Sequence, residues 1–459
     1  MLELGVFMNG QTDLPVRQTP TGTVLPSGSL ADMHASYQRG VLNQIKQGVL
    51  AEKLGFDYLW PVEHHFQPEG AEFSPNPMLM EMAVAAQTSR IRLGQYANIL
   101  TWWHPLRIAE QAAMLDVVSG GRVEFGLGRG YQPREVEVFG RTYGSTIQDQ
   151  ERNRSSFEEA LELLLKAWTE PSFSHHGENF SIPPLYTKWH HNMTIELLSQ
   201  PGYERSVEQV LKLARPDMYA SGNAVIATPT ILKELSVFPQ PLQKPHPQLW
   251  MPLTSERSIR WASARGMNGG FIVEPTWALK RNVETYYDEA EKQGWPDYQH
   301  RGQFKYGWDA ERKRGVMVLR PVVIMKDPKN KQELERVDLG MRLVWSYLGP
   351  FGFVALTGKT PEEKVRSDTP VSLEYLVDRE VVFLGTSEQV AEQILKLKND
   401  CGFDDFNFAA QFELAGFSNE EIEEQMHLFA EEVVPILRRE CGPSPWAAAE
   451  LVAAGNGRP

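Results

Sequence analysis

Residues 56–66 of the chain read FDYLWPVEHHF, and this stretch decides the expected fold. Its first part, Phe56 to Val62, is mostly apolar and is typical of a buried strand. The strand ends abruptly in the carboxylate of Glu63 and the adjacent imidazoles of His64 and His65. Parallel α/β barrels present ionisable groups at the C-terminal ends of their strands in this way. Because neighbouring strand residues point to opposite faces, the two histidines should differ in role, unless both are loop histidines bonded to backbone.

Apolar segments of this kind recur along the chain, and most of them precede apolar residues at helical spacing. With 56–62, the predicted strands are residues 2–8, 91–100, 122–127, 248–253, 269–273, 316–325 and 404–412. Eight alternations of strand and helix favour an α/β fold with an eight-stranded parallel (β/α)8 TIM barrel over an open sheet. A length of 459 residues fits such a barrel when long insertions extend from its C-terminal face.

We expect residues 1–441 to form a single barrel domain, followed by a frayed tail at 442–459. Three segments interrupt the alternation of strands and helices: a loop rich in Pro, Gly, Thr and Ser at 10–36, an insertion at 171–247 and an excursion at 341–380. Within the insertion, the pattern predicts only short helical pieces, at Val207–Ala214 and Thr230–Leu235.

Charge and composition restrict the function classes. A net charge of −13 opposes binding to a phosphate backbone, so we expect no nucleic-acid partner. No basic leader precedes Leu2–Met8, and no apolar run approaches the roughly 20 residues that span a bilayer, so a cytoplasmic protein without a membrane partner is expected. Cys401 and Cys441 form no disulfide framework. The pairs His175-His176 and His190-His191 lack metal-ligand spacing, so we expect no metal site.

A glycine run, Gly126-x-Gly128-x-Gly130, follows the fourth predicted strand. Its spacing is not G-x-G-x-x-G and no helix begins directly after it, which argues against a dinucleotide fingerprint. The glycines would instead let the backbone approach a flat ligand, and Arg129 would offer its guanidinium to a phosphate. The alternative is a surface arginine in a tight turn.

A second turn, Thr254 to Ser258, lies where a predicted strand ends and a helix begins. Hydroxyl groups and unpaired N–H groups at a helix N-terminus can hold a phosphate. Plain N-capping by Ser255 fits the sequence equally well. The aromatic patch from Trp345 to Phe353 likewise has two interpretations, a substrate or oligomer surface and ordinary core packing.

Taken in order, these stretches resemble the bacterial luciferase-like family of flavin-dependent monooxygenases. The resemblance covers most of the chain and rests on Gly55–Phe66, Ala97–Leu100 with His104-Pro105, Asp116–Arg122, Gly128–Gly130, Val138–Gly140, Trp261–Gly266 and Phe429–Pro435. Each segment alone is a weak signal, and together they are specific.

The resemblance implies a two-component enzyme. Reduced FMN, supplied by a separate flavin reductase, reacts with O2, and the flavin hydroperoxide oxygenates a small organic substrate. His64 looks like the catalytic histidine of the family, and Glu63 would orient or tune it. Ala97 and Asn98 lie where the family holds the flavin ring, and Tyr96-Ala97 falls where relatives often have a non-proline cis peptide bond.

For the flavin phosphate, the resemblance assigns Arg129 together with the hydroxyls of Thr254, Ser255 and Ser258. Family members commonly dimerise, and the residues of this chain do not decide whether it forms a homodimer.

The loop, the insertion and the bulk of Trp102-Trp103 depart from compact family members, and such loops set specificity. We therefore expect a mainly apolar or aromatic substrate in a pocket lined by Trp102, Tyr131 and Trp345. Two alternatives stay open: hydride transfer with a deazaflavin cofactor, and a flavin-binding protein without catalysis. The intact Glu63, His64 and Arg129 argue against the second alternative.

Overall fold

The computed structural model of the chain describes residues 2–185, 187–189, 230–294, 304–306, 309–404 and 406–443. Contacts within the chain define two compact units. Unit 1 comprises Met1–Asn98, Val118–Gly128 and Pro247–Pro459, and unit 2 comprises Ile99–Val117 and Arg129–His246.

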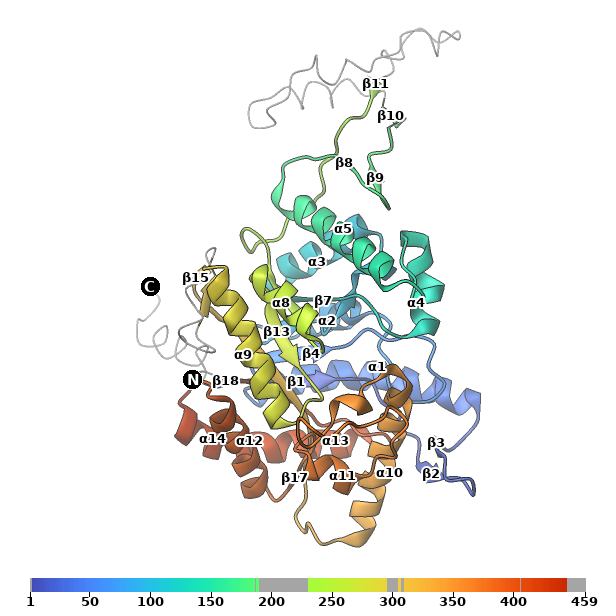
Figure 1. The fold of residues 1–459 in the computed structure, drawn as a ribbon, viewed down its shortest axis with the longest axis vertical. Helices are drawn as coiled ribbons and strands as arrows, with labels where there is room; N and C mark the ends of the chain where they lie inside the picture. Colours follow the sequence, from blue (N-terminus) through green and yellow to red (C-terminus); the bar gives the residue numbers. More distant parts are fainter. Residues whose placement is uncertain are drawn as a thin grey trace. The chain divides into compact units, whose positions relative to one another are not determined.

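Unit 1 contains a closed barrel of eight parallel strands, of which β1, β4, β7 and β13 are labelled near the centre of Figure 1. Around the barrel the strands are β1(Leu2–Met8), β4(Tyr58–Pro61), β5(Arg92–Gly94), β7(Val123–Gly128), β12(Gln248–Pro252), β13(Asn268–Phe271), β16(Val316–Ile324) and β18(Phe406–Gln411). Each strand pairs in parallel with the next, and β18 pairs with β1 to close the ring. The predicted TIM barrel is confirmed, and every predicted strand region overlaps one of these strands. Two shorter strands, β6(Asn98–Ile99) and β17(Phe383–Gly385), extend the sheet.

Aromatic side chains fill the barrel, and glycines on the neighbouring strands make room for them. Trp60 is fully buried and stacks on Tyr58, with ring centroids 5.4 Å apart, and it meets Trp250 edge to face at 4.9 Å. A Cβ at Gly94 would lie 2.2 Å from the Trp60 ring, and one at Gly5 would lie 2.7 Å from it. The absence of a side chain at these two glycines therefore allows a tryptophan inside a small barrel.

Polar groups gather where the barrel strands begin. The Arg92 guanidinium contacts the carboxylate of Glu124, whose second oxygen accepts a hydrogen bond from Trp250 Nε1 at 2.8 Å. Glu3 accepts from Tyr58 Oη and from Asn407 Nδ2, each at 3.1 Å. Burial, with a smaller contribution from the nearby charge of Asp57, raises the pKa of Glu3 to about 8. This end of the barrel is thus a buried titratable region distinct from the predicted site.

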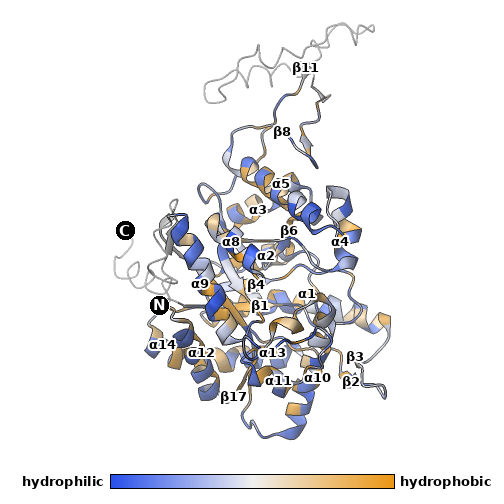
Figure 2. Cartoon of the chain, viewed as in Figure 1, coloured by the Kyte–Doolittle hydropathy of each residue, from blue (hydrophilic) through white to orange (hydrophobic). Residues whose placement is uncertain are grey.

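The helices of unit 1 cover the barrel with one apolar face each and expose polar residues on the other, as the mixed colours of α10 and α12 in Figure 2 show. They are α1(Leu30–Lys53), α2(Pro77–Ala85), α8(Glu256–Ala264), α9(Thr276–Lys292), α10(Lys331–Leu348), α11(Leu373–Asp378), α12(Ser387–Cys401), α13(Asn419–Leu428) and α14(Val434–Cys441). The sequence predicts a cap at Asn76 and capping boxes at Thr386 and Ser418, because Gln389 and Glu421 follow three residues later. All three are confirmed, and they begin α2, α12 and α13.

Two predicted boundaries are wrong. The loop expected at 10–36 ends at Ser29, because Ser29 and Asp32 form a capping box that begins α1 at Leu30. Within the remaining loop, β2(Val16–Gln18) and β3(Val24–Pro26) form a hairpin. The excursion expected at 341–380 begins inside α10, which continues to Leu348.

Unit 2 carries α3(Pro105–Ser119) through Val117, α4(Pro133–Phe139) and α5(Gln150–Thr169), together with the hairpin β8(His175–His176) and β9(Ser181–Ile182). The helix predicted at Thr230–Leu235 is wrong, since Thr230–Ile231 forms strand β11 and pairs with β10(Lys188–Trp189). The helix predicted at Val207–Ala214 lies outside the described residues, as does the tail from residue 444.

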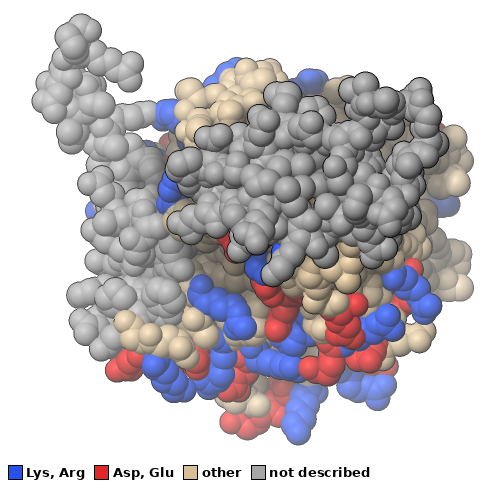
Figure 3. All heavy atoms as spheres, turned by 90° about the horizontal axis from the view of Figure 1, so that it is seen from above, with Lys and Arg blue, Asp and Glu red and all other residues tan. Residues whose placement is uncertain are grey.

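The surface seen in Figure 3 carries interspersed charges. Basic and acidic side chains of the described residues alternate there and do not separate into patches of one sign. Among the helices that the structure describes, none is both long and apolar enough to cross a membrane. In the same part of the chain, no group of three or more His, Cys, Asp or Glu side chains is arranged to hold a metal ion.

Candidate active site

His64 lies just beyond the C-terminal end of β4, where the chain folds back on itself. Its N–H donates to the carbonyl of Ser74 at 3.0 Å, and its carbonyl accepts from the Ser74 N–H at 3.3 Å. Phe66 adopts a left-handed conformation with φ of 59° and makes the sharp turn that this return requires. His64 as a whole residue is therefore buried, 8% exposed, at the barrel end where the site was predicted.

The two histidines face different carboxylates. Nε2 of His64 lies 3.6 Å from Oε2 of Glu72, whereas Nε2 of His65 lies 3.3 Å from Oε1 of Glu63. The two imidazoles thus have different carboxylate neighbours, and the difference in their roles stays a prediction. Orientation of His64 by Glu63 stays a prediction. Glu72 was not predicted, because it sits in an irregular loop where no spacing or motif marks it.

The end of β1 adjoins this loop through Asn9. The amide Nδ2 of Asn9 donates to the carbonyl of Ala71 at 3.3 Å and to Oε1 of Glu72 at 3.5 Å. The backbone N–H groups of Asn9 and Gly10 donate to Oε2 of Glu413, at 2.5 and 2.7 Å. Burial raises the pKa of Glu413 to about 7. Three polar side chains from the ends of β1, β18 and the β4 loop therefore form one connected group.

The peptide bond between Tyr96 and Ala97 is cis, which confirms the prediction for that position. The Tyr96 N–H donates to the carbonyl of Pro61, so this segment lies level with the end of β4. Asn98 donates through Nδ2 to Gln95 Oε1 at 2.9 Å and to the carbonyl of Gly126 at 3.1 Å. Its Oδ1 is buried and has no hydrogen-bond partner among the described residues.

Position 126 requires a glycine because another backbone segment lies too close to it for a Cβ atom. A Cβ at this position would lie 1.6 Å from the carbonyl oxygen of Gln95. The glycine at this position therefore makes room for the segment after β5. The predicted close approach to a ligand stays a prediction.

The predicted phosphate turn begins α8 with a capping box. Ser255 Oγ accepts from the Ser258 N–H at 3.2 Å, and Ser258 Oγ accepts from the Ser255 N–H at the same distance. The capping interpretation left open by the sequence is thus confirmed. Thr254 and Ser255 are exposed and Ser258 is buried, so the first two hydroxyls lie at the surface of unit 1.

Three predicted residues belong to unit 2. Arg129 donates through Nη1 to Asn153 Oδ1 at 3.2 Å, and its carbonyl accepts from Thr101 Oγ1 at 3.1 Å. Trp102 is buried against Phe139, with ring centroids 6.1 Å apart, and Tyr131 is half-buried. The asparagine on α5 thus helps to fix the predicted phosphate arginine.

Trp345, predicted to line the substrate pocket, lies on α10 in a core cluster of unit 1 and is 4% exposed. Val273, Leu376 and Leu414 belong to the same cluster. The surroundings of Trp345 are those of a core residue, which is the alternative interpretation of this aromatic patch.

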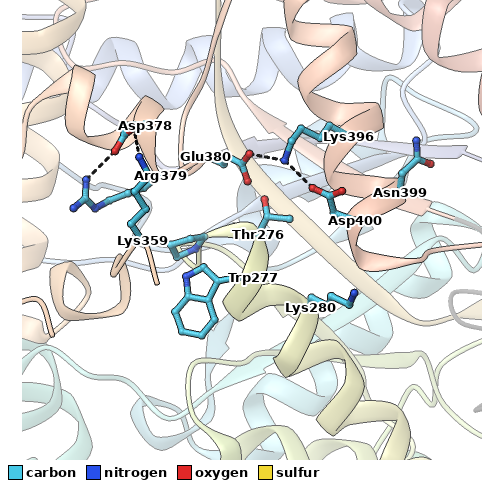
Figure 4. A pocket seen from close by; sticks show the side chains of 11 residues that line it. Thr276, Trp277, Lys280, Lys359, Asp378, Arg379, Glu380, Lys396, Asn399 and Asp400 are labelled. Carbon is cyan, nitrogen blue, oxygen red and sulfur yellow. Dashed lines mark hydrogen bonds and ion pairs between the residues drawn. The ribbon is translucent and has the colours of Figure 1, made fainter. Parts of the chain in front are cut away.

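A cleft of about 650 Å³ opens elsewhere in unit 1, beside the start of α9 and the end of α12 (Figure 4). Figure 4 shows Lys396 between Glu380 and Asp400, and both ion pairs measure 2.7 Å. Lys359 pairs with Asp378 at 2.5 Å. No predicted site residue lines this cleft. Since these charges neutralise one another, the connected group at the end of β4 is the stronger candidate for chemistry.

Comparisons with known proteins identify chains that are similar in sequence or in fold. Residues 20–195 match the family model of the luciferase-like monooxygenases. The oxygenase component of a flavin-dependent trigonelline monooxygenase from Acinetobacter baylyi (strain ATCC 33305 / BD413 / ADP1) is 30% identical over 136 residues, which are 29% of this chain and 35% of that protein. The chain spans about half, or less, of the curated relatives that it matches.

Solved structures share the fold over nearly the whole chain. The oxygenating constituent of 3,6-diketocamphane monooxygenase from Pseudomonas putida, in complex with FMN, has a TM-score of 0.64 at 20% identity. The superposition covers 94% of this chain and 98% of that one. An F420-dependent secondary alcohol dehydrogenase has a TM-score of 0.58 at 15% identity, covering 95% and 99%. At these identities the likeness concerns the fold alone.

Proposed function

We propose that this chain, which belongs to the luciferase-like monooxygenase family, is the oxygenase component of a two-component enzyme that uses reduced FMN and O2. The observation that carries the proposal is the buried imidazole of His64 beside Glu72 at the C-terminal end of β4. An imidazole with a carboxylate neighbour can hold and transfer a proton near neutral pH. Catalytic groups of TIM barrels occupy this end of the strands.

Several residues of unit 1 fit a flavin. Asn98 Oδ1 is a buried acceptor without a partner among the described residues, as a flavin ring N–H would require. The exposed Ser255 hydroxyl at the start of α8 suits a phosphate, since a helix N-terminus favours negative charge. Reduced FMN, when bound, supplies the electrons that activate O2.

The roles of the protein residues follow from these positions. His64 would hold or donate the proton at its imidazole. Ala97 and Asn98 would support the flavin ring, and Thr254, Ser255 and Ser258 would bind the phosphate. Arg129 would offer a charge-assisted bond to a flavin phosphate. Trp102 and Tyr131 would line a pocket for a mainly apolar or aromatic substrate.

A separate flavin reductase is part of the proposal. It is supported by the relative whose name contains the words "oxygenase component", since that name implies a second component. Hydride transfer with a deazaflavin is the second candidate, because an F420-dependent dehydrogenase shares the fold.

Binding experiments distinguish the two candidates. Under anaerobic conditions the purified chain should bind reduced FMN more tightly than reduced F420. Rapid mixing of the FMN complex with O2 should then give an absorbing species distinct from oxidised FMN. Preferential binding of F420, with no such species, would support the deazaflavin enzyme. Binding of neither cofactor would contradict both candidates.

A further inference from the structure

We propose that Glu72 is the positioning residue of His64, and that Glu413 holds Glu72 in place through Asn9. The inference rests on the proposed function, in which His64 is the catalytic imidazole. It adds three residues to that site, none of which the sequence pattern indicated.

The first link joins His64 to Glu72. Both side chains are largely buried, with 10% and 6% of their surface exposed, and the imidazole Nε2 lies 3.6 Å from the carboxylate Oε2. Little water screens two groups at this separation, so the negative charge of Glu72 acts strongly on the imidazole. A carboxylate in this position favours the protonated ring and restricts its orientation.

The second link fixes Glu72 itself. Asn9 is 6% exposed, and its Nδ2 donates to two consecutive residues of the loop, the carbonyl of Ala71 and the carboxylate of Glu72. The second carboxylate oxygen of Glu72 is the one that faces His64. Asn9 therefore holds Oε1 of the Glu72 carboxylate, while Oε2 of the same carboxylate faces the imidazole of His64.

The third link anchors Asn9. Oε2 of Glu413 accepts the N–H groups of both Asn9 and Gly10, and Oε1 lies 3.5 Å from Gln44 Nε2 on α1. Gly10 has a φ of +74°, and a Cβ there would lie 1.6 Å from the carbonyl oxygen of Phe73. The turn after β1 is thus packed directly on the loop that carries Glu72, so a shift at Glu413 would be transmitted to that loop.

Glu63 serves the other histidine in this arrangement. Its Oε1 lies 3.3 Å from Nε2 of His65, and its side chain is 1% exposed. Charged groups close to His64 in the described part of the chain include Glu72 from its own loop, the neighbouring pair of Glu63 and His65, and Glu413 beyond Asn9. The separate pairing gives a matched control, since Glu63 and Glu72 are both buried carboxylates near a histidine.

The test measures proton binding by His64 directly in the full chain without flavin. Protein labelled with 15N-histidine is titrated by NMR, and the His64 signal is assigned by its loss in His64→Gln. Glu72→Gln should move the His64 midpoint to lower pH. Glu63→Gln should move the His65 midpoint and shift His64 less than Glu72→Gln does. A larger effect of Glu63→Gln on His64, with little effect of Glu72→Gln, would overturn the proposal.

Asn9→Ala tests the chain of contacts when Glu72→Gln does not fold, as judged by circular dichroism. It removes the amide but keeps the backbone N–H that Glu413 accepts. The His64 midpoint should move in the same direction as in Glu72→Gln and by a smaller amount. An unchanged midpoint in Asn9→Ala would remove Asn9 and Glu413 from the proposal. These readouts need no flavin, so failure of the chain to bind FMN would refute the proposed function and leave this result intact.

Discussion

The carboxylate that faces His64 comes from a residue eight positions further along the chain, in a loop without regular structure. The strand end could be predicted from the contrast between apolar residues and the Glu63, His64 and His65 triplet. Glu72 could not, because its contact depends on the return of the loop to pair Ser74 with His64. Residues of this site can therefore be predicted from the sequence where a strand positions them, but not where an irregular loop does.

Glu3 gives a pH-dependent contribution to stability. Its pKa is about 8 in the folded chain and near 4.5 when the side chain is unconstrained. Between these values the folded state keeps a proton that the unfolded state has lost, so stability falls as pH rises from about 4.5 to about 8. The slope is at most about 1.4 kcal/mol per pH unit.

Urea denaturation at several pH values checks this expectation. Glu3→Gln should flatten the decline in the free energy of unfolding across that range. Glu362→Gln, at an exposed position, should leave the decline as it is. Equal slopes in the unsubstituted chain and Glu3→Gln would show that Glu3 is not the group responsible.

Arg129 tests the predicted phosphate contact. Loss of a charge-assisted hydrogen bond in Arg129→Ala should weaken FMN binding by about 1.5–3 kcal/mol. Arg129→Lys keeps the positive charge but lacks the planar guanidinium, so it should bind FMN more tightly than Arg129→Ala and less tightly than the unsubstituted chain. Isothermal titration with FMN measures both variants. Unchanged affinity in Arg129→Ala would remove this arginine from the cofactor site.

At the scale of elements, local rules predicted the helix starts well, because a cap is written in four consecutive residues. Thr386 and Ser418 begin their helices as expected. The start of α1 at Ser29 was not predicted, because residues 10–36 are rich in Pro, Gly, Thr and Ser and show no apolar period, so they were assigned to a loop. Spacing could not predict strand β11, because its two residues pair with Lys188–Trp189, far away in the sequence.

Ser255 has a structural role that can be separated from its proposed binding role. Ser255→Ala removes the cap of α8 and should lower stability by about 0.5–2 kcal/mol. Ser255→Asp retains a good cap but places a negative charge where the phosphate is proposed. It should keep the stability and weaken FMN binding. Thermal unfolding and FMN titration measure the two effects, and full FMN affinity in Ser255→Asp would confine Ser255 to capping.

Gly126 on β7 tests how tightly the strands meet beside the cis peptide bond. Gly126→Ala places a Cβ against a backbone oxygen, which cannot move aside as a side chain can. We expect it to lower the free energy of unfolding by about 1–3 kcal/mol or more. The control is Gly40→Ala within α1, where a Cβ meets nothing within 4 Å and should stabilise the helix by about 1 kcal/mol. A neutral Gly126→Ala would contradict the packing described.

At the scale of the whole molecule, the repeated alternation of strand and helix was sufficient to predict the barrel. Each strand was found from its own residues, and the closure of β7 onto β12 follows once eight strands are present. The loops at the C-terminal face were not predictable to the same degree. Their conformations depend on single long-range contacts, such as Asn9 with Ala71, which leave no periodic signal.

The central claim is that His64 acts on a reduced flavin held at this end of the barrel. The most direct measurement is stopped-flow absorbance after mixing O2 with the complex of reduced FMN, in the unsubstituted chain and in His64→Ala. We expect both proteins to bind reduced FMN, and the lifetime of the species that precedes oxidised FMN to change by about 100-fold in His64→Ala, which is the lower range for acid–base catalysis. Identical time courses in the two proteins would contradict this claim.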